Sequence, residues 1–322
     1  MSAIDTHART SGGIAPVVET GAAEGLAPVQ ESRARRTRGA MRWQTRQAVN
    51  FWLKWIMVIL AYIFLHAPLI VVIGASFNGG GEYAAIEFPP VSPSFEWYFE
   101  IPVGQFKSLG LSFALAALAS VSAVIIGVPA ALGLVRSNLP GKVLIGTVFR
   151  SPLQIPAVVS GIAFLQMFYL IGDTTGFYAQ GGFIGLAIGH IFIAIPYVVG
   201  TVVAVLQRFD HRLEEAALSL GASPWRTFRR VTLPVIMPGV YAGALYAFMV
   251  SFGDVPLSIF LTAPGYVTYP VELFSALEND FDPSILASGT LVILFCLVVM
   301  IVVQRVVGLD ALLKIGGTGK GR

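Results

Sequence analysis

The segment EEAALSLGASPWRTFRRVTLP, residues 214–234, is the most informative stretch of this 322-residue chain. Leu213, Ala216, Ala217 and Leu220 recur at the spacing of one helical face. Apolar side chains at this spacing are typical of an amphipathic helix. The pattern therefore predicts a short helix with a narrow apolar stripe at the beginning of the segment.

A tight turn and a second helix are predicted directly after the first. Gly221 suits the left-handed conformation that commonly ends a helix. Ser223 is a favoured N-cap residue and Pro224 suits the first helical position, so a second helix is expected to start at once and to continue until Pro234 disturbs it. By itself, this outline also fits an amphipathic helix lying on a lipid surface or a helix-turn-helix that reads DNA.

Apolar stretches long enough to cross a bilayer flank this segment on both sides. The chain is 55% hydrophobic and only 12% charged, with a mean hydropathy of +0.75, whereas soluble domains carry roughly twice that charged fraction. A membrane-spanning helix needs about 20 largely apolar residues. Six stretches meet this requirement: 51–76, 108–135, 143–171, 182–206, 236–263 and 284–309. The sequence therefore predicts an all-α integral membrane protein with about six transmembrane helices, two of them interrupted: the third by Arg150, Pro152 and Pro156, the fifth by Asp254 and Pro256. Membrane spans on both sides argue against the DNA-reading alternative and against nucleic acid as a partner.

The distribution of charge predicts the orientation of the chain. If the N-terminus is inside, the external loops are about 77–107, 172–181 and 264–283, and they contain Lys107 alone of the 21 basic residues. The same loops contain nine of the 18 acidic residues. An excess of Lys and Arg marks cytoplasmic loops. Both termini are therefore expected to be cytoplasmic, in a multi-pass protein.

The two ends of the chain are predicted to lie outside the membrane domain, which we place at residues 49–310. Residues 1–48 have few large apolar side chains and end in an Arg-rich cluster, which predicts a disordered cytoplasmic tail with a polybasic end. Residues 311–322 form a predicted cytoplasmic C-terminal tail, whose GGTGKGR sequence does not have the spacing of a phosphate-binding loop. ATP hydrolysis is therefore expected in a separate chain, and no cofactor is predicted.

The central segment also resembles a known family signature. The signature consists of Glu-Ala-Ala, three residues, Gly, nine residues, an aliphatic residue, any residue and Leu-Pro. Seven residues of this chain meet it, with Val in place of the usual Ile: Glu215, Ala216, Ala217, Gly221, Val231, Leu233 and Pro234. The chain therefore resembles the permeases of binding-protein-dependent ABC importers. The stretches 67–78, 88–98, 251–265 and 281–284 are similar to the spermidine/putrescine branch, so the resemblance extends over about residues 50–310.

The resemblance implies a fold, partners and a mechanism. It implies the type I ABC importer fold, in which a cytoplasmic coupling helix, here within the coupling elbow 210–234, docks into a cleft of the ATP-binding subunit. By the resemblance, Glu214 and the seven signature residues would couple this chain to that subunit. Such importers contain two ATPase chains, two permease chains and an extracytoplasmic solute-binding protein in a bacterial inner membrane. This chain would then form half of the pathway for a small solute, a polyamine or related cationic compound, next to a different second permease.

Ionisable residues within the predicted spans are candidate functional residues because their burial in a membrane is costly. Asp254, beside Gly253 and Pro256, is the substrate-pathway candidate, since a carboxylate suits an amine substrate. The alternative is that Asp254 only caps a broken half-helix. Arg150 is expected to reach the interface or to pair with an internal acid, and His190 is expected to pack between helices. No catalytic or metal site is predicted, because the chain has one Cys and four scattered His.

Two further functional classes remain as alternatives. An ion-coupled secondary transporter is expected to show inverted repeats with paired broken helices near the bilayer midplane. A membrane-bound enzyme is expected to bring together a nucleophile, a base or metal ligands. The sequence shows one acid-bearing broken span without a matching partner, and an ion-coupled transporter is not expected to have the cytoplasmic elbow. Four scattered His without a His-rich motif argue against the enzyme.

Overall fold

The computed structural model describes residues 27–79, 87–137, 140–279 and 282–307. Within these ranges the regular secondary structure is entirely helical, which confirms the predicted all-α class. A short 3₁₀ turn follows α4 and a π-helical turn follows α8. The helices are α1 (Ala27–Ala75), α2 (Glu96–Phe99), α3 (Val103–Arg136), α4 (Lys142–Arg150), α5 (Ala157–Thr175), α6 (Phe183–Leu206), α7 (Arg212–Ser219), α8 (Pro224–Thr227), α9 (Leu233–Phe252), α10 (Ser258–Leu261), α11 (Tyr269–Asn279) and α12 (Ser284–Val307).

Five helical runs in the described residues are long and apolar enough to cross a membrane. They are Asn50–Ala75 of α1, α3, α5, α6 and the continuous run Pro224–Phe252. Helix α12, Ser284–Val307, lies where the sixth span was expected. The five long runs and α12 therefore correspond to the predicted spans, and the largest differences in their boundaries are in the third and fifth spans.

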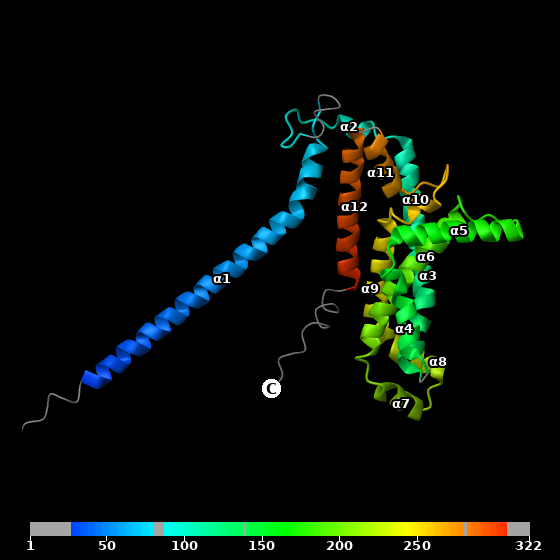
Figure 1. Cartoon of the computed structure of the whole chain (residues 1–322). Helices are drawn as coiled ribbons and strands as arrows, with labels where there is room; N and C mark the ends of the chain where they lie inside the picture. The colour runs from blue at the N-terminus through cyan, green and yellow to red at the C-terminus, as the bar shows by residue number, and fades with distance from the viewer. Residues whose placement is uncertain (1–26, 80–86, 138–139, 280–281, 308–322) are drawn as a thin grey trace, which may run out of the picture. The chain divides into compact units, whose positions relative to one another are not determined.

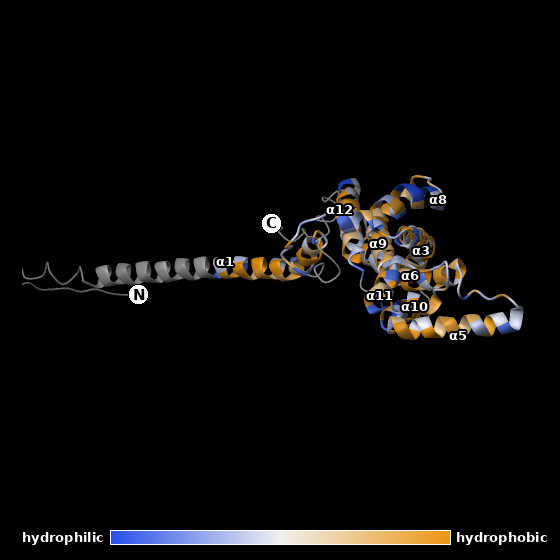
Figure 2. Ribbon diagram, turned by 90° about the horizontal axis from the view of Figure 1, so that it is seen from above, coloured by the Kyte–Doolittle hydropathy of each residue, from blue (hydrophilic) through white to orange (hydrophobic). Residues whose placement is uncertain are grey.

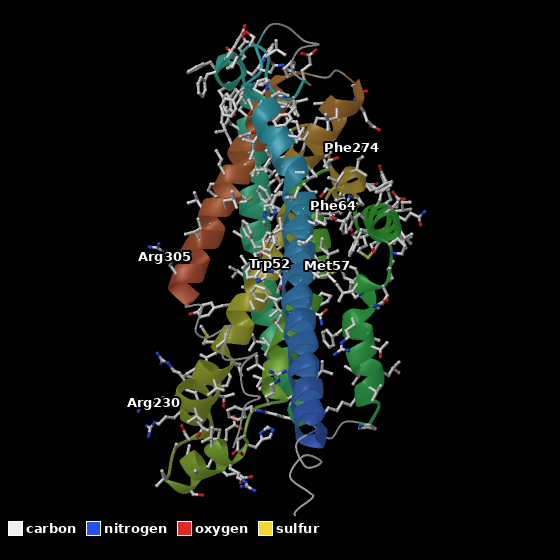
Figure 3. The ribbon with its side chains drawn as sticks, turned by 90° about the vertical axis from the view of Figure 1, so that its left-hand side faces the viewer. Trp52, Met57, Phe64, Arg230, Phe274 and Arg305 are labelled. Carbon is white, nitrogen blue, oxygen red and sulfur yellow. The ribbon has the colours of Figure 1, made fainter. Side chains whose placement is uncertain are left out.

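The chain divides into two compact units, Met1–Pro68 and Leu69–Arg322. In the first unit, α1 begins at Ala27, so residues 27–48 are helical where the sequence predicted disorder. The physical reason is that Arg, Gln and Ala are good helix formers, and adding residues to an existing helix avoids the cost of nucleation. Residues 1–26 lie outside the described residues. Trp52, Met57 and Phe64 are exposed on this helix, as expected for side chains that face lipid (Figure 3).

Helices α3, α6 and α9 form the centre of the second unit. They run side by side, with α7 and α8 at one end and α10 and α11 toward the other (Figure 1). Small and branched side chains fill their interface, including Ala119, Ala123, Val198, Val202 and Ile236. In the view from above, α3, α6 and α9 are coloured largely as hydrophobic (Figure 2). The packing of three long helices therefore provides the frame on which the shorter elements are placed.

Glycines allow α6 and α9 to approach closely. A Cβ atom at Gly243 would lie 2.4 Å from Thr201 Oγ1 and 2.8 Å from Val198 Cα, and one at Gly239 would lie 2.8 Å from Val205 Cγ2. Small residues spaced four apart are typical of close helix pairs in membranes, where packing replaces the hydrophobic driving force. The sequence GVYAG therefore sets the distance between the two helices.

The expected third span, 143–171, is not one continuous helix. Helix α4 ends at Arg150, a 3₁₀ turn covers Ser151–Leu153, and α5 begins at Ala157 and projects outward at a steep angle to α3, α6 and α9 (Figure 1). The interruption follows from Pro152 and Pro156, which cannot donate backbone hydrogen bonds inside a helix. The sequence identified the residues that interrupt this span, but it did not predict that the two parts run in different directions.

Replacement of Gly243 by Ala is expected to destabilise the second unit. The added methyl group meets the backbone of α6, which cannot move aside as a flexible side chain can, so a loss of about 1–3 kcal/mol is expected. Thermal unfolding of the detergent-solubilised chain measures the effect. Gly133→Ala in α3 is the matched control, because a Cβ there meets nothing within 4 Å. Equal melting temperatures for the two variants would contradict the close approach.

Candidate functional site

The first arm of the elbow is α7, which is closed at both ends by local hydrogen bonds. Asp210 Oδ1 accepts a hydrogen bond from the backbone N–H of Arg212 at 3.0 Å, at the beginning of the helix. At the other end Gly221 has φ +84°, and the N–H groups of Gly221 and Ala222 donate to the carbonyls of Leu218 and Ala217 at 2.9 and 3.1 Å. This is the Schellman arrangement, and it confirms the predicted left-handed turn at Gly221.

The second arm begins as predicted and continues further. Ser223 Oγ accepts from the N–H of Arg226 at 3.4 Å, and Pro224 occupies the first turn of α8. The helix does not end near Pro234, because a π-helical turn over Phe228–Thr232 leads directly into α9. The π-helical turn widens the helix just before Pro234, so that the Leu233 N–H donates to the Phe228 carbonyl and the proline ring has room beside the preceding turn. The prediction that the second helix ends near Pro234 is therefore wrong. The helical run that forms the fifth span begins at Pro224.

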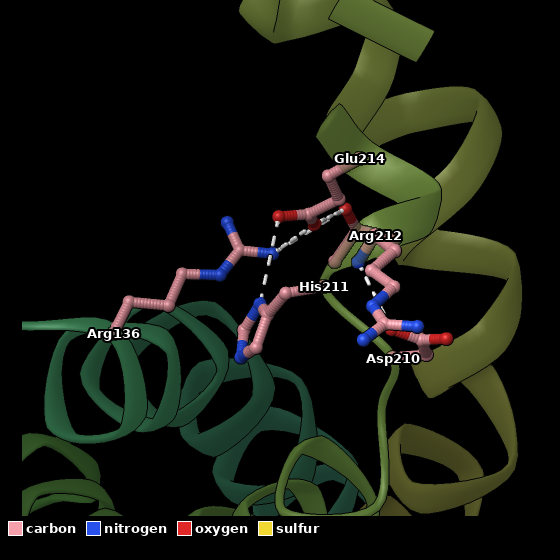
Figure 4. A network of polar contacts seen from close by, with 6 residues as sticks. Arg136, Asp210, His211, Arg212 and Glu214 are labelled. Carbon is pink, nitrogen blue, oxygen red and sulfur yellow. Dashed lines mark hydrogen bonds and ion pairs between the residues drawn. The ribbon is translucent and has the colours of Figure 1, made fainter. Parts of the chain in front are cut away.

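A partly buried carboxylate joins the elbow to the helix bundle. Glu214 Oε1 accepts hydrogen bonds from the Arg136 guanidinium and from the Thr232 hydroxyl, and Arg136 Nη2 also donates to Thr232 Oγ1 at 3.4 Å (Figure 4). The side chain of Glu214 is 16% exposed and Thr232 is fully buried. His211 Nδ1 lies 4.0 Å from the other carboxylate oxygen. We call Arg136, Glu214 and Thr232 the elbow triad, and it connects α7 to the ends of both α3 and the π-helical turn.

The remaining signature residues face different surroundings. Glu215, Ala216, Gly221 and Pro234 are exposed, whereas Ala217, Val231 and Leu233 are partly buried. Large apolar side chains next to them are also exposed, with Leu220 at 89% and Trp225 at 68%. Arg230 on the π-helical turn points away from the ribbon (Figure 3). The elbow therefore anchors its inner side through Glu214 and presents an apolar and basic outer surface.

The second polar feature is the break between α9 and α10. Asp254 Oδ2 accepts from the backbone N–H groups of Leu257 and Ser258, at 3.2 and 2.9 Å, and from the Ser258 hydroxyl at 2.9 Å. Asp254 is 9% exposed and therefore caps the half-helix α10 from a buried position. No hydrogen bond within the described part of the chain reaches its second oxygen, Oδ1. Asp254 thus caps the half-helix through Oδ2, as the alternative prediction expected, and its Oδ1 can still accept a hydrogen bond.

His190 completes a directed chain of hydrogen bonds at this break. It is fully buried, with Nδ1 at 2.8 Å from Ser251 Oγ and Nε2 at 2.9 Å from Ser258 Oγ. The single Ser258 proton goes to Asp254, so Nε2 must donate to Ser258, and in a neutral imidazole Nδ1 then accepts from Ser251. His190 therefore connects the end of α9 to the start of α10 across the break, a role that its helical position in the sequence did not reveal.

The site residues predicted from sequence thus fall into two separate groups. The signature residues gather at the elbow, and Asp254 lies at the far end of α9. Arg136, Thr232 and His190 belong to these groups but were not predicted as functional, because their partners lie far away in sequence. In the described ranges no group of three or more His, Cys, Asp and Glu residues is arranged to hold a metal ion.

These features define a class of protein: a multi-pass helical membrane protein with a polar elbow at one end of its bundle. The model of the family "Binding-protein-dependent transport system inner membrane component" matches residues 39–308. The chain therefore belongs to this family and is a permease subunit of a binding-protein-dependent ABC importer.

Relatives and solved structures agree with this assignment. The chain is 31% identical over 241 residues to the putrescine transport system permease protein PotI of Escherichia coli (strain K12), covering 74% of this chain and 84% of PotI. It is 30% identical over 247 residues to the spermidine/putrescine transport system permease protein PotC of the same strain, covering 76% of this chain and 90% of PotC.

Among solved structures, the chain resembles a bacterial ABC transporter involved in the import of the acidic polysaccharide alginate. The TM-score is 0.60 at 17% identity, covering 79% of this chain and 94% of that chain. The likeness shows a shared fold, which is the type I permease fold.

The elbow triad generates a testable difference between two neighbouring acids. Glu214→Ala removes the shared acceptor and leaves Thr232 and Arg136 without it, so we expect α7 to lose about 1–3 kcal/mol of local stability. Hydrogen–deuterium exchange of the α7 amides should then be roughly tenfold faster or more. Glu215→Ala is the matched control, because Glu215 is exposed in the same turn. Equal exchange in the two variants would show that the triad does not hold α7.

Proposed function

We propose that the elbow, residues 210–234, docks into a separate ATPase subunit and transmits its movement to the membrane helices. The observation that carries this proposal is the elbow triad, which connects α7 to α3 and to the start of α9 through one carboxylate. A partner that moves α7 would move both helices as a rigid body, because the shared bonds leave α7 little independent freedom. The role of this chain is transport, and the chemistry of ATP hydrolysis belongs to the partner.

The outer surface of the elbow has the composition of a protein interface. Glu215, Ala216, Leu220 and Trp225 are exposed around the glycine turn. Aromatic and apolar residues at the centre of an exposed patch are typical of binding surfaces. The small Ala216 and Gly221 allow close approach of a partner backbone. Glu214 stabilises the inner side of the elbow, whereas Glu215 offers its carboxylate to a basic group of the partner.

The proposed assembly has two ATPase chains, this chain with a different second permease, and an extracytoplasmic solute-binding protein. One coupling elbow in this chain corresponds to one of the two ATPase chains, so this chain forms half of the transmembrane pathway. Both termini and the elbow face the cytoplasm of a bacterium, in agreement with the basic residues of the internal loops. Membership of the importer family favours ATP coupling over the ion-coupled alternative.

The proposed substrate is a polyamine or a related cationic amine. PotI is named as a putrescine permease and PotC as a spermidine/putrescine permease. The alignment with this chain covers 84% of PotI and 90% of PotC. A buried carboxylate with a free oxygen, Asp254 Oδ1, can accept charge-assisted hydrogen bonds from an ammonium group. Nine acidic residues in the predicted external loops would raise the local concentration of a cation.

Cross-linking and ATPase measurements test the coupling proposal. In the complex reconstituted in lipid discs with its ATPase and binding protein, Leu220→Cys should cross-link to the ATPase chain. Loaded binding protein should stimulate ATP hydrolysis, and Glu215→Lys or Gly221→Asp should abolish the stimulation while the complex still assembles. Cross-linking of Leu220→Cys to the binding protein instead would reverse the proposed orientation. Undiminished stimulation in both variants would remove the elbow from coupling.

Two substitutions at Asp254 separate its capping role from a substrate role. Asn remains a good N-cap residue and lacks the charge, whereas Ala removes both. If Asp254 binds the substrate amine, Asp254→Asn should raise the apparent KM for putrescine uptake roughly tenfold or more without loss of thermal stability. Asp254→Ala should in addition lower the melting temperature. An unchanged KM in Asp254→Asn would leave Asp254 as a cap alone.

A further inference from the structure

A cavity of about 420 Å³ lies apart from both the elbow and the Asp254 break. Helices α3, α4 and α6 contribute its walls. Its lining residues are Leu134, Val135, Lys142, Val143, Gly146, Thr147, Arg150, Val199, Gly200, Val203 and Gln207. The proposed coupling and substrate functions leave this cavity without a role, although its lining combines apolar side chains with two cations and has no acidic residue.

Helix α4 presents both cations to the same cavity. Lys142 is its first residue and Arg150 its last, and Lys142, Gly146 and Arg150 follow the i, i+4, i+8 spacing of one helical face. Eight residues of helix correspond to a rise of about 12 Å. The two charges therefore mark the two ends of one strip on the cavity wall, with Gly146 between them.

Both cations have donors left for an anion. Lys142 Nζ donates to the carbonyls of Val135 and Ser137, at 2.9 and 3.2 Å, and an ammonium group has a third N–H. The Arg150 guanidinium has no hydrogen-bond or ion-pair partner within the described residues, so the internal acid expected from sequence is not found there. A cavity with two cations and no carboxylate is complementary to an anion.

The apolar part of the lining indicates what kind of anion fits. The cavity wall contains four apolar side chains, which offer no hydrogen bonds to a small hydrated anion: Leu134, Val143, Val199 and Val203. Val143, at 85% exposed, extends this apolar surface to the outside of the bundle. A molecule with a phosphate group and a hydrocarbon chain satisfies both parts of the lining. Basic pockets between transmembrane helices near the cytoplasmic surface are suited to acidic lipid headgroups.

We propose that this cavity binds an anionic phospholipid, with the phosphodiester between Lys142 and Arg150 and an acyl chain along the valine wall. This inference rests on the proposed orientation, which places the cavity in the cytoplasmic leaflet. Lys142 also caps the end of α3, whose last residue, Arg136, holds Glu214 of the elbow. The bound lipid therefore stabilises the end of α3 from which the elbow triad is built.

Native mass spectrometry of the purified full-length chain tests the binding directly. The chain in detergent is titrated with phosphatidylglycerol or with phosphatidylcholine of the same acyl chains. We expect phosphatidylglycerol to bind at least roughly tenfold more tightly, and Lys142→Gln/Arg150→Gln to remove this preference. Arg305→Gln on α12 is the matched control and should keep it. Melting temperatures exclude unfolding as the cause.

Three outcomes would overturn the proposal. Equal binding of the two lipids would show an apolar groove without headgroup recognition. Displacement of phosphatidylglycerol by millimolar inorganic phosphate would show a site for a free anion. Loss of the lipid on assembly with the second permease would show that the cavity is a subunit interface. Lipid binding is measured without ATP, so failure of the coupling experiment does not affect this test. Failure of the lipid test likewise does not affect the coupling experiment.

Discussion

A membrane-spanning chain must satisfy its backbone polar groups internally, since lipid tails offer no hydrogen bonds. This constraint explains why the break after α9 is surrounded by polar side chains. The first N–H groups of α10 have no partners within that helix, and Asp254 accepts from the first of them, at Ser258, and from Leu257 just before it. Burial of a carboxylate in this place costs free energy. The hydrogen-bond chain from Asp254 through Ser258 and His190 to Ser251 offsets part of that free energy. The break is therefore a stabilised element of the fold.

At the elbow, too, one carboxylate oxygen accepts more than one hydrogen bond. Glu214 serves Arg136 and Thr232 with one oxygen, and through them it attaches a surface helix to the bundle. A salt bridge between exposed groups contributes little to stability, but this carboxylate is largely buried and its partners are fixed by α3 and by the π-helical turn. The adjacent acid, Glu215, has no such restraint and stays on the surface. Two consecutive glutamates thus have different surroundings: Glu214 is bonded to the bundle and Glu215 is exposed.

Features that depend on neighbours in sequence were predicted well. The left-handed turn at Gly221, the N-cap at Ser223 and the interruption at Asp254 all follow from local conformational preferences. The elbow triad joins residues 78 positions apart, and no local preference indicates that Arg136 and Glu214 meet. Pro234 was misjudged because a π-helical turn, which depends on packing against α7, can accommodate a proline that ordinarily ends a helix. Direction after a break, as between α4 and α5, is likewise set by tertiary packing.

The elbow and the Asp254 break lie at the two ends of one helical run. Pro224–Phe252 is 29 residues without interruption, which corresponds to about 43 Å of helix. Its π-helical turn contributes Thr232 to the elbow triad, and its last turn carries Ser251, which His190 connects to α10. A rigid helix with a fixed partner at each end transmits displacement more directly than one with flexible joints. Gly239 and Gly243 hold α9 close against α6 along this run. Movement of the elbow would therefore reach the polar break through α9 itself, without a chain of side-chain rearrangements between the two sites.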